Sequence, residues 1–242
     1  MVKEIKSGGA GKGSRRLAVK LRTAKGRKIA STRWLQRQLN DPYVAEAKSQ
    51  GLRSRAAFKL SEIDDKSHIL KPGMRVVDLG AAPGGWSQVA AARVRSGEGS
   101  AKVVAVDLSA MEPIAGVEVL ALDVTAPGAA EGIKAALGGG LAQVVLSDMA
   151  APATGHRSTD HLRVVALVEA ALDIAEDVLA PGGTFLAKVF QGGAGQELGS
   201  RLKRAFAKVQ HVKPKASRAE SPETYVLATG FRGSRAEPSE GS

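Results

Sequence analysis

From Arg75 onward, short apolar runs alternate with longer stretches whose apolar residues recur at helical spacing. Short runs rich in valine are typical of strands, and the stretches between them are typical of helices. The expected strands are 75–79, 102–108, 117–122, 143–149 and 184–190, and the expected helices are 85–95, 129–137, 159–179 and 194–209. This alternation predicts a mostly parallel sheet that is covered by helices on both faces.

Two more strand candidates, 211–217 and 224–229, follow each other without a helix between them. They predict an antiparallel hairpin that closes one edge of the sheet. The expected fold is therefore α/β and Rossmann-like, with a mostly parallel seven-stranded sheet and an antiparallel C-terminal hairpin.

Helical periodicity also covers the region from Thr32 to about Glu62, where we expect two helices separated near Asn40-Asp41-Pro42. Ahead of this region the chain mixes Lys, Arg, Gly and Ser with almost no large apolar side chain. We therefore predict a disordered basic RNA-binding arm at 1–30, N-terminal helices at 31–70, a core at 71–232 and a frayed tail at 233–242.

The positive charge is concentrated near the N-terminus. Of the 35 Lys and Arg residues, 16 lie in the first 60 positions, together with only 3 of the 24 acids. A segment this basic attracts polyanions, and counterion release favours nucleic acid as the partner. Two alternatives stay open. One is a solvated arm that only aids solubility, and the other is a mitochondrial transit peptide, which the glycine content and the missing amphipathic pattern disfavour.

The chain has no cysteine, which excludes disulfides, thiolate metal ligands and a cysteine nucleophile. We expect no metal site. The longest apolar runs fall far short of the roughly 20 residues that span a bilayer. We therefore expect no membrane segment and a cytoplasmic protein.

The first expected strand leads into a glycine-rich turn at 80–85. In a doubly wound sheet, ligands bind beyond the carboxyl ends of the strands, and glycines let the backbone approach them closely. The spacing Gly80-x-x-x-Gly84 differs from the G-x-G-x-x-G of dinucleotide enzymes, which disfavours a nicotinamide-dependent oxidoreductase. Taken alone, the turn could equally be ordinary loop geometry.

Three successive strands end in aspartates, Asp78, Asp107 and Asp123. Asp107 lies about 20 residues past the turn, the spacing at which a carboxylate binds the ribose hydroxyls of an adenosine. We expect Asp123 to face the adenine, and Asp78 to anchor the turn or contact a methionine amino group. Each is alternatively a plain cap or turn former. Together, the turn and the three acids indicate a site for S-adenosylmethionine.

A second group of charged residues adjoins apolar strands. Asp148 follows the fourth strand, and Lys188 interrupts the apolar fifth strand. A lysine in a buried strand is costly unless it is paired or used, so we expect Lys188 at the mouth of the same pocket rather than snorkelling to the surface. Lys59 and Glu223 also adjoin apolar stretches, and sequence spacing does not bring these four residues together.

Five motifs resemble those of the FtsJ-type ribosomal RNA ribose 2′-O-methyltransferases and occur in the same order, over roughly residues 32 to 231. The motifs are 53–60 (Arg-Ser-Arg-Ala-Ala-Phe-Lys-Leu), 78–88 (Asp-Leu-Gly-Ala-Ala-Pro-Gly-Gly-Trp-Ser-Gln), 146–149 (Leu-Ser-Asp-Met), 188–192 (Lys-Val-Phe-Gln-Gly) and 213–225, which holds Lys-Pro-Lys-Ala-Ser-Arg and Ser-Pro-Glu-Thr-Tyr. The chain is most similar to the bacterial members that act on large-subunit RNA.

This resemblance implies a class I methyltransferase that depends on S-adenosylmethionine. The family's catalytic Lys-Asp-Lys-Glu tetrad falls on Lys59, Asp148, Lys188 and Glu223. The family's cofactor contacts fall on Gly84, Trp86, Asp107, Asp123 and Asp148. Trp86 is equally suited to pack the helix that follows the turn. The chain departs from the family at Pro152, which comes one position later than in the usual Asp-Met-Ala-Pro-Asn, and in its long basic arm.

The chemistry fits these residue types. A ribose hydroxyl is a poor nucleophile, so methyl transfer needs a base at the oxygen and alignment within about 3 to 3.5 Å. Lys188 is the expected base. It must be desolvated or set beside another cation such as Lys59 to accept a proton, while Asp148 holds its amine and the two carboxylates act in the opposite direction.

By the same resemblance, the substrate is the ribose 2′-hydroxyl of a uridine in the peptidyl-transferase-centre region of 23S rRNA, within the large ribosomal subunit or its late precursor. With 2 Trp, 2 Tyr and 5 Phe, the chain offers few stacking surfaces, so the Lys and Arg residues between 12 and 59 are the expected docking surface for RNA. A monomer is the simplest expectation. The alternative function is a ribosome-assembly factor of the same fold with incidental methylation.

Overall fold

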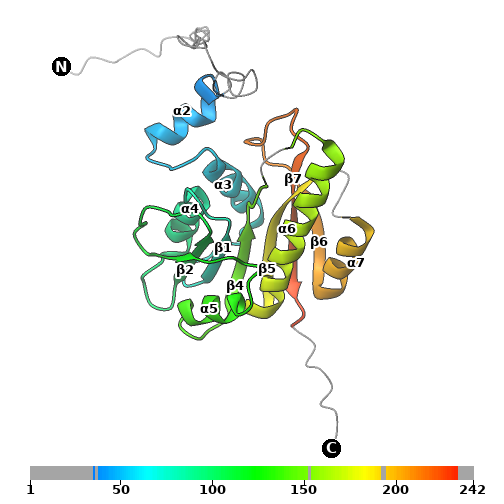
Figure 1. Cartoon of the computed structure of the whole chain (residues 1–242). Coiled ribbons are helices and arrows are strands. Elements are labelled where there is room, and N and C mark those ends of the chain that lie inside the picture. Colours follow the sequence, from blue (N-terminus) through cyan, green and yellow to red (C-terminus); the bar gives the residue numbers. More distant parts are fainter. Residues whose placement is uncertain (1–34, 36–37, 152–153, 192–194, 234–242) are drawn as a thin grey trace, which may run out of the picture. The chain divides into compact units, whose positions relative to one another are not determined.

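The computed structural model describes residue 35 and residues 38–151, 154–191 and 195–233 (Figure 1). The predicted arm at 1–30 and the predicted tail, apart from Gly233, lie outside these residues. The chain divides between Ala45 and Glu46 into two units, and the second unit carries every predicted site residue.

The second unit contains a seven-stranded sheet with the strand order β3-β2-β1-β4-β5-β7-β6. The strands are β1 (Arg75–Leu79), β2 (Lys102–Asp107), β3 (Val117–Ala121), β4 (Ala142–Ser147), β5 (Leu179–Phe190), β6 (Phe206–Val212) and β7 (Glu223–Phe231). Strands β1 to β5 pair in parallel, and β7 pairs antiparallel with both β5 and β6. This arrangement confirms the predicted fold class.

Burial explains why the parallel strands form. Most residues of β1, β2 and β4 are fully buried, as expected for strands that are covered on both faces. The strand order reverses between β1 and β4, because the chain runs outward from β1 to β3 and then returns to β4. In such sheets this reversal point opens a crevice for ligands at the carboxyl ends of the strands.

The helices are α2 (Pro42–Ser49), α3 (Ala56–Ser67), α4 (Gly85–Val94), α5 (Ala129–Ala136), α6 (Arg157–Val178) and α7 (Gly195–Ala205). Residues of α3 and α4 share one hydrophobic cluster with one face of the sheet, and residues of α5, α6 and α7 share a second cluster with the other face (Figure 1). Within the described ranges, no helix is both long enough and apolar enough to cross a bilayer.

Several predicted boundaries are wrong. The fifth strand was expected to begin at 184, but β5 begins at Leu179. The last helix was expected to run to 209 and the next strand to span 211–217, but α7 ends at Ala205 and β6 spans Phe206–Val212. Phe206 is 1% exposed, and its ring packs against Phe231 and Phe185 at centroid distances of 5.3 and 6.2 Å. Burying this ring between two strands outweighs the helical periodicity that continues past it.

The helical region before the core also differs from the prediction. A helix begins at Pro42 as expected, but the chain leaves it after Ser49 and starts α3 at Ala56. Gly51, with a φ of 69°, occupies the left-handed region in this break. The other helix expected here, from Thr32, lies mostly outside the described residues.

Candidate active site

The glycine turn after β1 lies against the loop that follows β4. Gly80 has a φ of 71°, and a Cβ atom at this position would lie 2.4 Å from Cγ and 3.0 Å from Cα of Met149. Only glycine therefore fits here, because both the backbone conformation and the packing exclude a side chain. The contact brings the turn next to Asp148, the residue before Met149.

Asp78 is fully buried at the end of β1. Ser87 Oγ donates a hydrogen bond of 2.6 Å to Asp78 Oδ2, whereas Oδ1 has no partner among the described residues. Burial raises the pKa of Asp78 to about 7, the bond from Ser87 opposes this rise, and the negative charges of Asp148 and Asp107 add to it. A buried carboxylate with a free oxygen is costly unless a ligand pairs with it.

Asp107 ends β2 at the same turn. Its Oδ2 accepts the backbone N–H of Ala82 at 2.9 Å, and its Oδ1 accepts the N–H of Ser109 at 2.7 Å. The carboxylate therefore anchors the turn after β1, and each oxygen keeps a second lone pair for a ligand.

Asp123, which follows β3, is exposed. Its Oδ1 accepts the hydroxyl and the backbone N–H of Thr125 at 2.7 and 2.9 Å, and these two bonds hold its pKa below the usual value. This geometry is that of a turn-forming aspartate. A role for Asp123 toward a cofactor stays a prediction that would use its other oxygen.

The side chain of Trp86 packs inside the protein. It is 2% exposed, its Nε1 donates to the carbonyl oxygen of Ala56 at 2.8 Å, and its ring centroid lies 5.6 Å from that of Tyr225. The side chain of Trp86 therefore has the packing role, which is one of the two roles that the sequence left open. Only the backbone of Trp86 remains for the predicted cofactor contact.

The four residues of the predicted tetrad come together at the carboxyl ends of β4 and β5. Lys188 is 7% exposed, and its Nζ donates to Oδ1 and to the carbonyl oxygen of Asp148 at 2.9 and 2.7 Å. Lys59 on α3 completes the group, with its Nζ 2.7 Å from Glu223 Oε1 and 3.9 Å from Asp148 Oδ2. Sequence spacing could not foresee this convergence, because α3 and β7 are far apart along the chain.

Glu223 remains ionised in this cluster. Burial alone would raise its pKa, but the positive charge and hydrogen bond of Lys59, with the charge of Lys188, hold its pKa below the usual value. Ser217 Oγ donates a further bond of 2.9 Å to Glu223 Oε1. The cluster therefore pairs two lysine side chains with two acidic side chains, and most of the surface of all four is withdrawn from water.

Tyr225 is a member of the cluster that the sequence did not reveal. Its side chain is fully buried, and its hydroxyl lies 2.9 Å from Asp148 Oδ1 and 3.2 Å from Glu223 Oε1. Tyr225 lies opposite Lys188 in the β5–β7 register. Period two along β7 places Tyr225 on the same face as Glu223, and this spacing is the signal that could have identified it.

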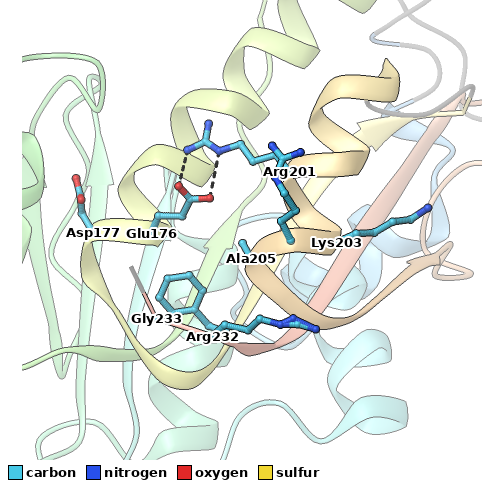
Figure 2. Close-up of a pocket in the computed structure, with 9 residues that line it drawn as sticks. Glu176, Asp177, Arg201, Lys203, Ala205, Arg232 and Gly233 are labelled. Atoms are coloured by element: carbon cyan, nitrogen blue, oxygen red, sulfur yellow. Dashed lines mark hydrogen bonds and ion pairs between the residues drawn. The ribbon is translucent and has the colours of Figure 1, made fainter. Parts of the chain in front are cut away.

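Another cavity, of about 760 Å³, lies at the opposite end of the sheet, where α6 and β7 end and β6 begins (Figure 2). Figure 2 shows Arg201 of α7 directed at Glu176 of α6, with hydrogen bonds of 3.1 and 2.7 Å. No predicted site residue lines this cavity.

The described residues also contain no group of three acidic or histidine side chains that would hold a metal. The candidate active site is therefore the cluster around Asp148 and Lys188, next to the glycine turn.

Comparisons with known proteins identify relatives of this chain. The profile of the family described as FtsJ-like methyltransferase matches residues 52–231. A protein of Xanthobacter autotrophicus named "Ribosomal RNA large subunit methyltransferase E" is 61% identical over 92% of this chain and 87% of its own length. A protein of the same name from Paramagnetospirillum magneticum is 61% identical over 94% of this chain and 93% of its own length. Among solved structures, a protein described as a ribosomal RNA methyltransferase of Plasmodium falciparum shares 30% identity and a TM-score of 0.66, over 75% of this chain and all of that one.

Proposed function

The chain belongs to the FtsJ-like methyltransferase family, and on this premise we propose that it methylates a ribose 2′-hydroxyl of large-subunit ribosomal RNA with S-adenosylmethionine as the methyl donor. The name that the two bacterial relatives share supports the choice of large-subunit RNA. The single observation that carries the proposal is the buried Lys188 held by Asp148 beside the glycine turn. The target nucleotide that the family resemblance implies is a uridine in the peptidyl-transferase-centre region of 23S rRNA.

The residues beside the turn fit such a cofactor. The free oxygen of buried Asp78 suits a cationic amino group, and the carboxylate of Asp107 suits ribose hydroxyls. We propose that Gly84, Asp123 and Asp148 complete the binding residues, together with the backbone of Trp86. Trp86 lies in the first turn of α4, where backbone N–H groups have no partner within the helix. The bound cofactor would supply an electrophilic methyl group on a positively charged sulfur.

The two contacts between Lys188 and Asp148 explain how a lysine can act as the base. A neutral amine has two N–H bonds and one lone pair. The side-chain and backbone oxygens of Asp148 accept from the amine at 2.9 and 2.7 Å. If both N–H bonds point at Asp148, the lone pair is left for the proton of the ribose hydroxyl. In this proposal Lys188 takes the hydroxyl proton as the ribose oxygen forms its bond to the methyl carbon. The bond between that carbon and the sulfur would break in the same step, which would leave the sulfur as a neutral thioether.

Lys59 and Glu223 have supporting roles in the proposal. The amine of Lys59 lies 3.9 Å from Oδ2 of Asp148, the residue whose other carboxylate oxygen holds Lys188. Glu223 fixes Lys59 in place at 2.7 Å. Lys59 can also donate to the ribose oxygen as negative charge develops on it.

A transfer assay with mapping of the product tests the proposed function. Large ribosomal subunits that lack the modification are incubated with the protein and S-adenosylmethionine labelled in its methyl group. We expect label in the large-subunit RNA as one 2′-O-methyl nucleotide. We also propose that the active protein is a monomer. Label on a base, or binding to the subunits without transfer, would contradict the proposal, and the second outcome would favour an assembly factor.

A further inference from the structure

A second cavity adjoins the tetrad, between the end of β5, the start of α6 and the loop before β7. Its volume is about 440 Å³. Three lining residues are sequence neighbours of tetrad members: Ala151 comes three residues after Asp148, Phe190 two after Lys188, and Pro222 just before Glu223. The cavity therefore opens beside the residues that would bind the reacting ribose.

The backbone fixes this cavity close to Lys188. Phe190 lies two residues beyond Lys188 on β5, a separation of about 6.6 Å along an extended strand. Phe190 is also paired with Glu223 in the antiparallel register. The N–H of Gln191 donates to the carbonyl oxygen of Pro222 at 2.6 Å, which joins the two sides of the rim. A group attached to the reacting ribose can reach this position.

The lining suits a flat and uncharged ring. Phe190 and Val164 supply apolar surface, and the amide of Gln191 and the imidazole of His161 supply polar groups. Asp160 also lines the cavity, but Thr154 and Gly155 occupy its carboxylate with three hydrogen bonds of 2.7 to 3.2 Å. Apolar walls with a few neutral donors and acceptors are typical of sites for unstacked nucleobases, whereas phosphates need cations.

We propose that this cavity binds the base of the nucleotide whose ribose is methylated. The inference rests on the proposed function and deepens it by naming where the substrate base lies. The base must then leave its stack in the RNA, which selects an unpaired or weakly stacked nucleotide as the target. Gln191 would hydrogen-bond the base edge, and Phe190 would contact its face.

The test compares two RNAs with four proteins. Each large-subunit RNA is assembled by ligation so that the methylated position carries either its natural base or an abasic ribose, which keeps the 2′-hydroxyl. The proteins are the wild type, Gln191→Ala, Phe190→Leu and Gln210→Ala. The Gln210→Ala variant is a matched control on β6, away from the cavity lining. Because the Gln191 side chain is exposed, its loss should leave the fold intact, and a thermal unfolding curve checks this.

On natural RNA, we expect both cavity variants to lower kcat/KM about ten-fold, mainly through KM, as is typical when one contact to a bound base is lost. The control should stay within two-fold of the wild type, and all four proteins should bind S-adenosylmethionine equally in calorimetry. On abasic RNA, all four should be equally slow, because the contacts under test no longer exist.

Two results would overturn this inference while the proposed function stands. The first is cavity variants that are as active as the wild type on natural RNA. The second is cavity variants whose kcat/KM on abasic RNA falls below that of the wild type by the same factor as on natural RNA. If the wild type methylates neither RNA, the proposed function itself fails, and the inference fails with it.

Discussion

Asp148 is the residue on which the candidate site converges. Lys188, Lys59 and Tyr225 all approach its carboxylate, at distances of 2.9, 3.9 and 2.9 Å. Tyr225 has one proton to donate and two carboxylates within reach. Burial and the nearby charges of Asp148 and Glu223 raise the pKa of Tyr225 well above its usual value, so the hydroxyl stays a donor across the physiological range. Tyr225 is therefore a positioning residue for Asp148.

Replacing Tyr225 with phenylalanine tests this role. The ring should keep its packing against Trp86, but Asp148 loses a donor, and bonds to charged groups contribute about 1.5 to 3 kcal/mol. We expect the free energy of unfolding to fall by about that amount, and kcat to fall about ten-fold while the Kd for S-adenosylmethionine stays unchanged. Ser217→Ala, which removes a donor from Glu223 alone, is the comparison and should lower kcat less. An unchanged kcat in Tyr225→Phe would show that Asp148 needs no such support.

Asp78 gives a pH-dependent prediction. Its pKa is raised from 3.8 to about 7 in the folded protein, so the folded state holds this proton more tightly than the unfolded state. The contribution of Asp78 to stability is therefore full below about pH 4 and is lost as the pH rises to about 7. A pKa difference of this size corresponds to at most about 4 kcal/mol.

Asp78→Asn should therefore stabilise the cofactor-free protein at pH 8, with the gain shrinking toward pH 4 in denaturant unfolding experiments. The same change should weaken binding of S-adenosylmethionine at pH 8, because the ionised carboxylate that pairs with the amino group is gone. A stability difference between the two proteins that does not vary with pH would contradict the raised pKa.

At the scale of elements, β1 and its turn position the site. The valine run predicted β1 correctly and the glycines predicted its turn, because a buried parallel strand has a strong hydrophobic signal. Lys188 and Asp148 could also be predicted, since burying a charged residue at the end of an apolar strand is costly unless that residue is paired or functional. Lys59 and Glu223 came only from the family resemblance, because their meeting depends on how α3 packs and on the β5–β7 register.

Features that depend on packing across elements escaped prediction. The β6 boundary was misplaced because helical periodicity continues past Ala205, and only the burial of Phe206 ends the helix there. The cavity beside Phe190 leaves no local trace in the sequence, since it arises from elements brought together by the fold. The spacing of Tyr225 and Glu223 along β7 could have placed Tyr225 beside the site, but its contact with Asp148 depends on that same packing.

Gly80→Ala tests the close packing of the turn. The new methyl group would meet the backbone of Met149 at 3.0 Å, and Gly80 already has a positive φ. Gly97→Ala is the matched control, because Gly97 also has a positive φ, 93°, but no atom within 4 Å of the new methyl position. We expect Gly80→Ala to cost about 1 to 3 kcal/mol more than Gly97→Ala in denaturant unfolding and to weaken cofactor binding. Equal losses would show that backbone strain alone is responsible.

At the scale of the whole molecule, the distribution of positive charge bears on which residues bind RNA. Arginines at the start of the second unit have structural contacts: the guanidinium of Arg53 donates to the carbonyl oxygens of Pro83, Glu112 and Pro113, and that of Arg55 donates to the carbonyl oxygen of Ala216. These two side chains are therefore occupied in holding loops around the site. The predicted docking surface for RNA stays the set of Lys and Arg residues between 12 and 59, most of which lie in the predicted arm.

Deleting residues 1–30 removes ten Lys and Arg residues and one Glu. We expect weaker binding to large-subunit RNA and a shallower dependence of log K on log salt between about 50 and 200 mM, because fewer counterions are released. Filter binding measures both quantities. Deleting 234–242, which carries one Arg and two Glu, is the control and should leave the slope unchanged. An arm deletion with the same affinity and slope as the full chain would mean that the arm has no part in binding.

The most direct test of Lys188 as the base is the single-turnover rate of 2′-O-methylation by Lys188→Ala on large ribosomal subunits. Loss of a general base typically costs 10²–10⁴-fold. We predict a rate at least about a hundred-fold below that of the wild type, with unchanged Kd values for S-adenosylmethionine and for the subunits. Lys203→Ala, at an exposed lysine of α7, should match the wild type. A folded Lys188→Ala protein that methylates the same nucleotide at near wild-type rate would contradict the proposal that Lys188 is the base.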